Sequence, residues 1–363
     1  MENCTLAINP EYFSSGVILS APIILEMACN SVMFFIGVPL NTISMLKMIR
    51  TARFRNRRHS SVINTAQQRF NMIKLHLSTA YLMMLLFYTP LHLVWLTARS
   101  WQAGDFLCRF LKFLDVLVFY ASSNVVAVVA LDRVIILRRS QEHPLAAYYR
   151  VRLMLACAWL AAALTSSPQL YAWQTFEPLP GWSQCTTLWA VWRWNNCHRS
   201  RLPIEIVYSS LHLLAVFWVP LGVVVICYVW VFRMLLRHQR LRKSFRSQQL
   251  WRQTMSTDGE LTLRRGVSST TAAAGIKTVG LTRQRSQSPF QQAKVSAVRQ
   301  SVYIVGAYVL CWLPYNAIAL SSNVAPRTVR WVTNFQGLFE ALILLNAVLN
   351  PILYRDKTSL RLS

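Results

Sequence analysis

The sequence predicts an all-α protein, a seven-transmembrane helix bundle with its N-terminus outside the cell and its C-terminus in the cytosol. Three observations predict this fold. Of the 363 residues, 54% are apolar and only 14% are charged, which is too little charge for the surface of a water-soluble protein of this length. Seven stretches are apolar over about 20 residues or more, the length that crosses a bilayer. Basic residues gather in alternate loops between these stretches.

The seven apolar stretches follow one another with one long interruption and without an internal repeat. They cover residues 22–49, 70–98, 108–138, 150–173, 203–236, 295–322 and 331–354. The second and the seventh are the least apolar, because they contain Lys74, His76, His92 and Glu340. The first 20 residues lack a basic start followed by an apolar core, so no cleavable signal peptide is expected. The first stretch is then expected to act as the insertion signal.

The orientation follows from the basic loops. The net charge is +25, and 14 Lys or Arg lie between Arg233 and Arg299 against two acids. The loops at 50–58 and 138–152 are also basic, whereas the first 26 residues contain no Lys or Arg. The positive-inside rule places the basic loops in the cytosol. There they face anionic lipid and cytosolic partners, and nucleic acid is not expected as a partner.

The chain is predicted to form one domain. Its parts are an extracellular N-terminus at 1–21, helices one to five with their loops at 22–237, a third cytosolic loop at 238–292, helices six and seven at 293–354, and a short cytosolic tail at 355–363. The 238–292 loop is rich in Ser, Thr, Gln and Arg, so we expect it to be disordered. Its two short Arg/Ser patterns resemble kinase sites, although such patterns also arise by chance.

The seventh stretch ends in Asn350-Pro351-Ile352-Leu353-Tyr354. Proline removes a backbone hydrogen bond and kinks a helix, and an amide in hydrocarbon is unfavourable unless it is satisfied. Asn346, Asn350 and Tyr354 are spaced by four residues, so they share one helix face. The pattern indicates either a tolerated structural kink or a broken helix that packs against polar partners inside the bundle.

The third stretch carries a functional group at each end. Cys108 opens it and Asp132-Arg133 closes it, a distance of about 37 Å along a helix, which crosses the membrane. Cys108 can bridge to Cys185 in the 174–202 loop, since disulfides persist outside the cell; Cys4 and Cys197 also lie outside. Arg133 can pair with Asp132 or turn inward to Tyr228 and Tyr354, which would make a two-state switch. The alternative is an ordinary interfacial ion pair.

Taken together, these positions resemble the rhodopsin-like (class A) G-protein-coupled receptors over residues 22–355. The matching residues are Asn41, Cys108, Asp132-Arg133, Trp159, Cys185, Pro220, Tyr228, Cys311-Trp312-Leu313-Pro314 and Asn350-Pro351-Ile352-Leu353-Tyr354. Within the class, the chain is most similar to the gonadotropin-releasing hormone and adipokinetic hormone receptor group, and vasopressin-like receptors share several of the same stretches. The supporting stretches are Leu131-Asp132-Arg133, Ser167-Pro168-Gln169-Leu170, Gln184-Cys185-Thr186-Thr187 and Cys311-Trp312-Leu313-Pro314-Tyr315.

The resemblance implies a multi-pass receptor of the plasma membrane, not an enzyme, with no cofactor and no catalytic metal. It implies a disulfide between Cys108 and Cys185 and coupling to a heterotrimeric G protein, with Gq and calcium suggested. Arrestin and kinases would act through the 238–292 loop. The switch and coupling residues carried over from the family are Asp132, Arg133, Tyr228, Asn350, Pro351 and Tyr354. Asn3 in Asn3-Cys4-Thr5 is a candidate glycosylation site on the predicted outside.

The chain departs from the family pattern in four places. Tyr81 stands where the second helix usually carries a buried aspartate that helps to hold sodium. Without that carboxylate a cation loses its formal counter-charge in a low-dielectric site, so we expect no allosteric sodium. Val134 replaces a tyrosine, and Tyr308 replaces a phenylalanine one turn before Trp312. Lys294 stands where a carboxylate could have held Arg133, which suggests a weak resting lock.

Ionisable side chains inside a membrane bundle are candidates for function. The predicted ligand-binding residues are His92, Lys112, Asp115, Trp312, Tyr315 and Asn316. Their mixed polar chemistry suits the backbone and termini of a peptide hormone or neuropeptide. One alternative is a monoamine receptor that uses Asp115 as the counter-ion of the ligand's ammonium group. In another, Lys112 and Asp115 only neutralise each other at i,i+3 spacing.

A seven-helix transporter or enzyme is a third possibility from a different class of proteins. The sequence shows no inverted repeat, no zinc-like set of His and Asp, and no lysine in the seventh stretch of the kind that binds retinal. The receptor hypothesis is therefore preferred over this one.

Overall fold

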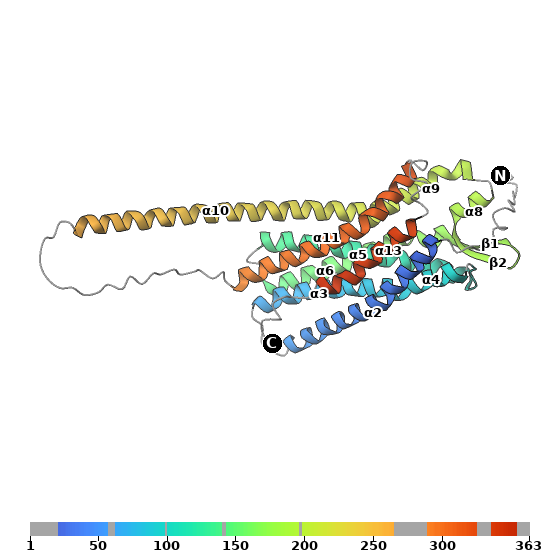
Figure 1. Cartoon of the computed structure of the whole chain (residues 1–363), viewed down its shortest axis with the longest axis horizontal. Coiled ribbons are helices and arrows are strands. Elements are labelled where there is room, and N and C mark those ends of the chain that lie inside the picture. The colour runs from blue at the N-terminus through green and yellow to red at the C-terminus, as the bar shows by residue number, and fades with distance from the viewer. Residues whose placement is uncertain are drawn as a thin grey trace.

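The computed structural model describes residues 21–56, 62–98, 100–139, 143–195, 198–264, 289–324 and 335–353. Within these ranges, seven helices are long and apolar enough to cross a membrane, and they lie side by side in one bundle (Figure 1). The predicted all-α bundle of seven membrane-spanning helices is confirmed. Asn3, Tyr354 and the terminal segments of the predicted domain organisation lie outside the described residues.

The seven spans are built from the following elements, most of them labelled in Figure 1. They are α2 (Ala21–Asn56), α3 (Val62–Met83) with η1 (Met84–Tyr88) and α4 (Thr89–Ala98), α5 (Gly104–Arg138), α6 (Pro144–Ser166) with α7 (Gln169–Ala172), α9 (His198–Leu213) with η2 (Leu214–Trp218) and α10 (Val219–Arg264), α11 (Pro289–Val324), and α13 (Gln336–Leu353). We call the bundle end near Cys108 the outer end and the end near Arg133 the inner end.

A two-stranded antiparallel hairpin and a short helix follow α7 at the outer end. The elements are β1 (Trp173–Leu179), β2 (Trp182–Thr187) and α8 (Leu188–Trp194). The hairpin turns at Pro180-Gly181, where Gly181 has a φ of 79°. Proline followed by a left-handed glycine is the preferred pair for a tight turn of this kind. The turn folds β2 back over the bundle, which brings Cys185 to the outer end of α5.

Two spans contain a π-helical turn, η1 and η2, each just before a proline. Pro90 and Pro220 have no N–H to donate, and a π turn is one way for a helix to absorb the lost hydrogen bond. The Thr89 hydroxyl also donates to the Met84 carbonyl at 3.4 Å. A π turn changes the face on which the following residues lie, so η1 decides where His92 on α4 points.

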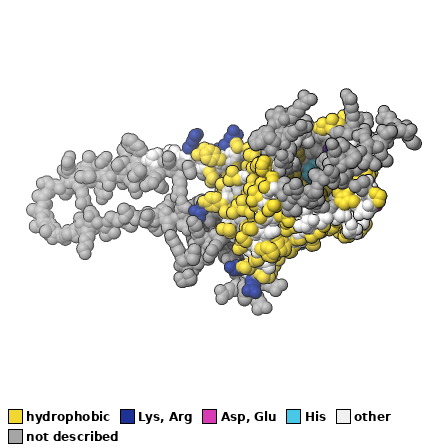
Figure 2. Space-filling view, turned by 45° about the vertical axis from the view of Figure 1, so that its right-hand side comes forward, with side chains coloured by type: hydrophobic (Ala, Val, Ile, Leu, Met, Phe, Trp, Pro, Cys, Tyr) yellow, Lys and Arg dark blue, Asp and Glu magenta, His cyan; other side chains and the backbone are white. Residues whose placement is uncertain are grey.

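The bundle is packed inside and apolar outside. Its largest fully buried side chains include Trp312, Tyr81, Tyr308 and Phe217. Large apolar side chains also cover most of the described surface that Figure 2 shows. Lys and Arg side chains lie at the edge of this apolar surface, toward the inner end. Such a surface is expected where lipid, not water, surrounds the helices.

The segment that follows the fifth span begins as a helix. We expected disorder from residue 238, but α10 continues as a helix to Arg264 and projects well beyond the bundle (Figure 1). Residues 238–264 contain no proline and are rich in Arg, Leu and Gln, which have high helix propensity. Composition alone indicated disorder because it ignored this local preference. Residues 265–288 of the predicted loop lie outside the described residues.

Candidate ligand site and inner switch

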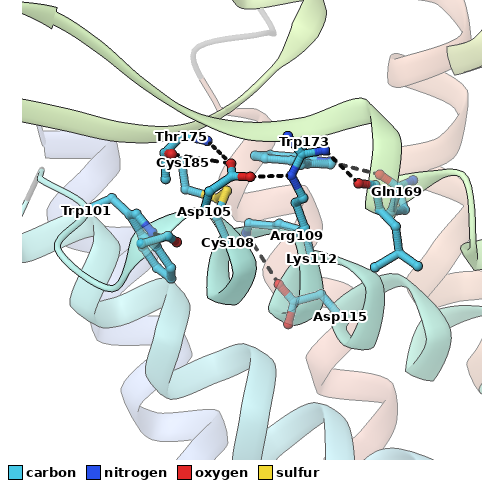
Figure 3. The surroundings of a disulfide bond; sticks show 12 residues. Trp101, Asp105, Cys108, Arg109, Lys112, Asp115, Gln169, Trp173, Thr175 and Cys185 are labelled. Atoms are coloured by element: carbon cyan, nitrogen blue, oxygen red, sulfur yellow. Dashed lines mark hydrogen bonds and ion pairs between the residues drawn. A yellow bond between two sulfur atoms is a disulfide. The ribbon is translucent and has the colours of Figure 1, made fainter.

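The outer end of α5 is tied to the β1–β2 hairpin by a disulfide. Cys108 and Cys185 are bonded with their Cα atoms 5.5 Å apart, as predicted. Around the disulfide, the Thr175 backbone N–H donates to Asp105 at 2.8 Å, and Arg109 donates to the other oxygen of that carboxylate at 2.6 Å (Figure 3). The hairpin is therefore fixed over the bundle by both covalent and polar contacts.

On α5, Lys112 lies about one turn and Asp115 about two turns beyond Cys108 of this disulfide (Figure 3). Lys112 Nζ donates to Asp115 Oδ2 at 3.3 Å, and it also lies 4.9 Å from the centroid of the Trp173 ring on β1. Trp173 is in turn held by a 2.8 Å hydrogen bond to Gln169. The contact between Lys112 and Asp115 is thus present. It leaves Asp115 Oδ1 buried and without a hydrogen-bond donor among the described residues.

A second polar cluster lies between α2, η1, α4 and α13. His92 Nε2 is 2.7 Å from Glu26 Oε1, and the Tyr88 hydroxyl donates to Glu340 Oε1 at 2.6 Å. The Tyr88 and His92 rings stack with centroids 5.3 Å apart. A methyl group on Gly337 would overlap the Glu26 carboxylate, so glycine allows α2 and α13 to approach here. This places His92 among partners that were not predicted.

Four residues of this cluster were not predicted as site residues from the sequence: Glu26, Tyr88, Gly337 and Glu340. An acid within an apolar stretch is itself a signal of function, so Glu26 and Glu340 could have been found in this way. Tyr88 and Gly337 carry no comparable signal, because an isolated Tyr or Gly in a membrane helix is usually structural. Asp115 lies within electrostatic range of both Glu340 and His92, which joins the two clusters into one outer network.

The remaining predicted ligand residues belong to α11. Tyr315 interacts with the Gln336 side chain and lies within electrostatic range of Glu340. Asn316 is buried and donates from Nδ2 to the Trp312 carbonyl at 2.9 Å, while its Oδ1 has no donor among the described residues. Trp312 lies one turn before Asn316 on α11, and its ring centroid is 5.9 Å from that of Phe119 on α5.

Below Trp312 an aromatic cluster links η2, α11 and α5. The Trp312 ring lies 5.2 Å from Tyr308 and 6.4 Å from Phe217, measured between centroids. The Tyr308 hydroxyl donates to Ser123 Oγ at 3.1 Å, in a fully buried position. The tyrosine that departs from the family pattern therefore makes a hydrogen bond that phenylalanine could not make.

We expect Tyr308→Phe to raise basal G-protein activation severalfold. The change removes one buried hydrogen bond between α11 and α5, worth about 1 kcal/mol, and the freed Ser123 hydroxyl can bond to its own helix. Basal nucleotide exchange on purified G protein measures the effect. Tyr303→Phe on the exposed face of α11 is the matched control. Equal exchange by both variants and the parent would show that the bond does not restrain activation.

Two arrangements were predicted for Arg133 at the inner end. The structure has the first of them, in which Arg133 pairs with its neighbour Asp132. Its Nη2 lies 3.2 Å from Asp132 Oδ2, and the other oxygen of Asp132 lies 3.7 Å from Arg150 Nη2. Tyr228 is within electrostatic range of Arg133, but no hydrogen bond joins them in the described part of the chain. The second predicted inward partner, Tyr354, is not among the described residues.

The hinge near Pro351 is held by amides and a hydroxyl. Asn346 Nδ2 donates to the Tyr81 hydroxyl at 2.8 Å, and Asn350 Nδ2 donates to the Asn346 carbonyl at 2.7 Å. Asn41 Nδ2 donates to the Ala347 carbonyl at 2.9 Å. Tyr81 thus occupies the place of the usual aspartate as a hydrogen-bond partner. Among the described residues, no group of three His, Cys, Asp or Glu side chains could hold a metal ion.

Residues 63–354 match the sequence model of the family described as "7 transmembrane receptor (rhodopsin family)". The match covers most of the chain, and the protein belongs to this family of G-protein-coupled receptors. It is accordingly a receptor and not an enzyme, and a multi-pass protein of the plasma membrane.

The most similar relatives that we describe are receptors too, and two of them are named for peptide hormones. The chain is 27% identical to "G-protein coupled receptor daf-38" of Caenorhabditis elegans, with 91% of this chain and 87% of the relative covered. It is 26% identical to the gonadotropin-releasing hormone II receptor of Callithrix jacchus, covering 77% of this chain and 63% of that receptor. It is 29% identical to the human vasopressin V1b receptor, covering 70% and 56%. The similarity to the gonadotropin-releasing hormone group is therefore confirmed.

Proposed function

We propose that the protein is a receptor for a peptide hormone or neuropeptide. In this proposal it signals through a heterotrimeric G protein of the Gq class, and the output is a rise in calcium. The observation that carries the ligand class is a pair of buried acceptors, Asp115 Oδ1 and Asn316 Oδ1, without donors among the described residues. Buried acceptors are costly unless they are paired. A peptide backbone or terminus supplies N–H donors to them, and its carbonyls can meet donors such as Lys112.

The names of the relatives support the same class, since two of the three relatives above are receptors for peptide hormones. The monoamine alternative is weaker, because Lys112 already contacts the carboxylate that an ammonium ligand would need, and Trp173 holds Lys112 in place. A ligand with a single positive charge would have to share Asp115 with a resident cation. Like charges at such distances repel.

In this proposal the agonist binds the active state more tightly and so shifts an existing equilibrium. It would contact His92, Lys112 and Asp115 of the outer network, and Tyr315 and Asn316 on α11. The signal would pass from Asn316 to the Trp312 backbone, from the Trp312 ring to Tyr308, and from Tyr308 to Ser123 on α5, through contacts already described. The inner half would then open around Arg133.

The decisive experiment records calcium and cyclic AMP in cells that express the receptor, against panels of amidated peptides and of monoamines. For a peptide agonist, we expect Asp115→Asn to weaken potency by about tenfold or less, because one interaction among many is lost. For an amine, the same change would remove the response entirely. Glu177→Gln, at the exposed tip of the hairpin, is the control. Silence toward both panels together with solute transport would overturn the proposal.

We also propose that the N-terminus is extracellular and carries a glycan at Asn3, and that the C-terminus is cytosolic. Kinases and arrestin would act on the 238–292 segment, in which the α10 extension keeps the first part helical. These assignments rest on the basic loops and on the family resemblance. Mobility shifts after glycosidase treatment and antibody access to each terminus in intact cells would test the orientation.

A further inference from the structure

At the inner end, one aromatic ring lies close to two buried cations. The centroid of the Phe70 ring on α3 is 4.3 Å from Arg133 Cζ and 4.4 Å from Lys74 Nζ. All three residues are at least 96% buried. A cation near an aromatic face is attracted by the ring quadrupole, and the attraction is strongest where water is excluded. Phe70 therefore contributes to the position of Arg133.

The carboxylate beside Arg133 is shared. Asp132 lies 3.2 Å from Arg133 but also 3.7 Å from Arg150, and the buried Arg69 lies within electrostatic range of Arg133. One negative charge thus lies beside two guanidinium groups, and a third guanidinium group lies near Arg133. A shared carboxylate holds each partner less firmly than a dedicated one, so the orientation of Arg133 depends on a further attraction.

α11 offers no carboxylate for this purpose. The helix contains neither Asp nor Glu along its whole length from Pro289 to Val324, and the sequence places Lys294 where an acid could have held Arg133. A resting lock between α5 and α11 of the acid–arginine kind is therefore excluded for the residues of α11. The contact that Arg133 makes across the inner end is instead with α3.

We propose that Phe70 is the positioning residue that holds Arg133 in its resting orientation, in place of a carboxylate on α11. The guanidinium group of Arg133 is attracted both by the aromatic face of Phe70 and by the negative charge of Asp132. Activation requires Arg133 to leave both. Lys74 tunes this step, because it shares the ring with Arg133 and repels it. When Arg133 leaves, Lys74 stays at the ring and the face remains covered.

The test uses the full-length receptor in lipid nanodiscs with purified heterotrimeric G protein, and it reads basal GTPγS binding, so no agonist is needed. We expect Phe70→Leu to raise the basal rate by up to about tenfold, since a desolvated cation–π contact is of the size that changes an equilibrium by that factor. Phe70→Trp keeps an aromatic face and should leave the rate near that of the parent. Ile73→Leu, a volume-conserving change of a buried residue on the same helix, is the control.

Two further variants separate positioning from simple packing. Lys74→Met removes the repelling cation, so basal exchange should fall, which a destabilised core would not explain. Combining Phe70→Leu with Asp132→Asn should give less than the product of the single effects, because both release the same arginine. The proposal is overturned if Phe70→Leu leaves basal exchange unchanged at equal amounts of folded receptor, or if the combined effects multiply. Should Phe70→Leu fail to fold, an unchanged or raised rate in Lys74→Met would overturn it.

Discussion

Cys108→Ser is expected to abolish the agonist response and to lower the thermal stability of the receptor. The disulfide that it removes joins positions 77 residues apart, and the loop-entropy estimate for a link of this length is about 4 kcal/mol. The hairpin would then be held only by contacts such as Asp105 with Thr175 and Trp101 with Ser183. Exposed polar contacts of this kind contribute little, so Trp173 would no longer fix Lys112 beside Asp115.

The measurement pairs thermal unfolding of the purified receptor with surface expression and agonist-evoked calcium. Cys185→Ser should reproduce the defect, and the double variant should be no worse than either single one, because both remove the same bond. Cys157→Ser is the control, since Cys157 is an exposed free cysteine on α6. A Cys108→Ser receptor with parental melting temperature and response would show that the hairpin is held by its other contacts.

The sequence predicted those features that depend on composition and on spacing along one helix. Seven apolar stretches gave the bundle, and i,i+3 spacing gave the contact between Lys112 and Asp115. The disulfide came from the family resemblance, because several cysteines were placed outside. These predictions succeed because the bilayer imposes length and polarity rules on each helix separately.

Contacts between helices were not predictable in the same way. The pair of Glu26 with His92 depends on how far η1 rotates α4 toward α2, and on the space that Gly337 leaves. The approach of Phe70 to Arg133 depends on the packing of α3 against α5. A single sequence gives no rotation angle for a helix that is apolar on most sides, so these partners become visible only in three dimensions.

Basal activity of the parent receptor is expected to be insensitive to sodium, and Tyr81→Asp is expected to make it sensitive. In the parent, the Tyr81 hydroxyl accepts a hydrogen bond from Asn346, and both side chains are fully buried. No formal negative charge is supplied at that position, and a desolvated cation without a counter-charge is unfavourable by several kcal/mol. The substitution creates a buried carboxylate beside Asn346, which itself bonds to Asn350. A buried carboxylate without a counter-charge is unfavourable, so a bound cation stabilises it.

The experiment compares basal GTPγS binding in sodium chloride and in the chloride of a bulky organic cation, both at an ionic strength of about 0.15 M so that screening is equal. Sodium should leave the parent unchanged and suppress the Tyr81→Asp variant, because bound sodium stabilises the resting packing around Asn350. Tyr81→Phe is the control for lost hydrogen bonding: it removes the acceptor of Asn346, costs about 1–3 kcal/mol, and should remain insensitive to sodium. Suppression of the parent by sodium, together with an unaltered response in Tyr81→Asp, would mean that amide and hydroxyl oxygens alone hold the ion. In that case the hinge at Pro351 would be controlled by a cation after all, and not by the hydrogen bonds of Tyr81, Asn346 and Asn350.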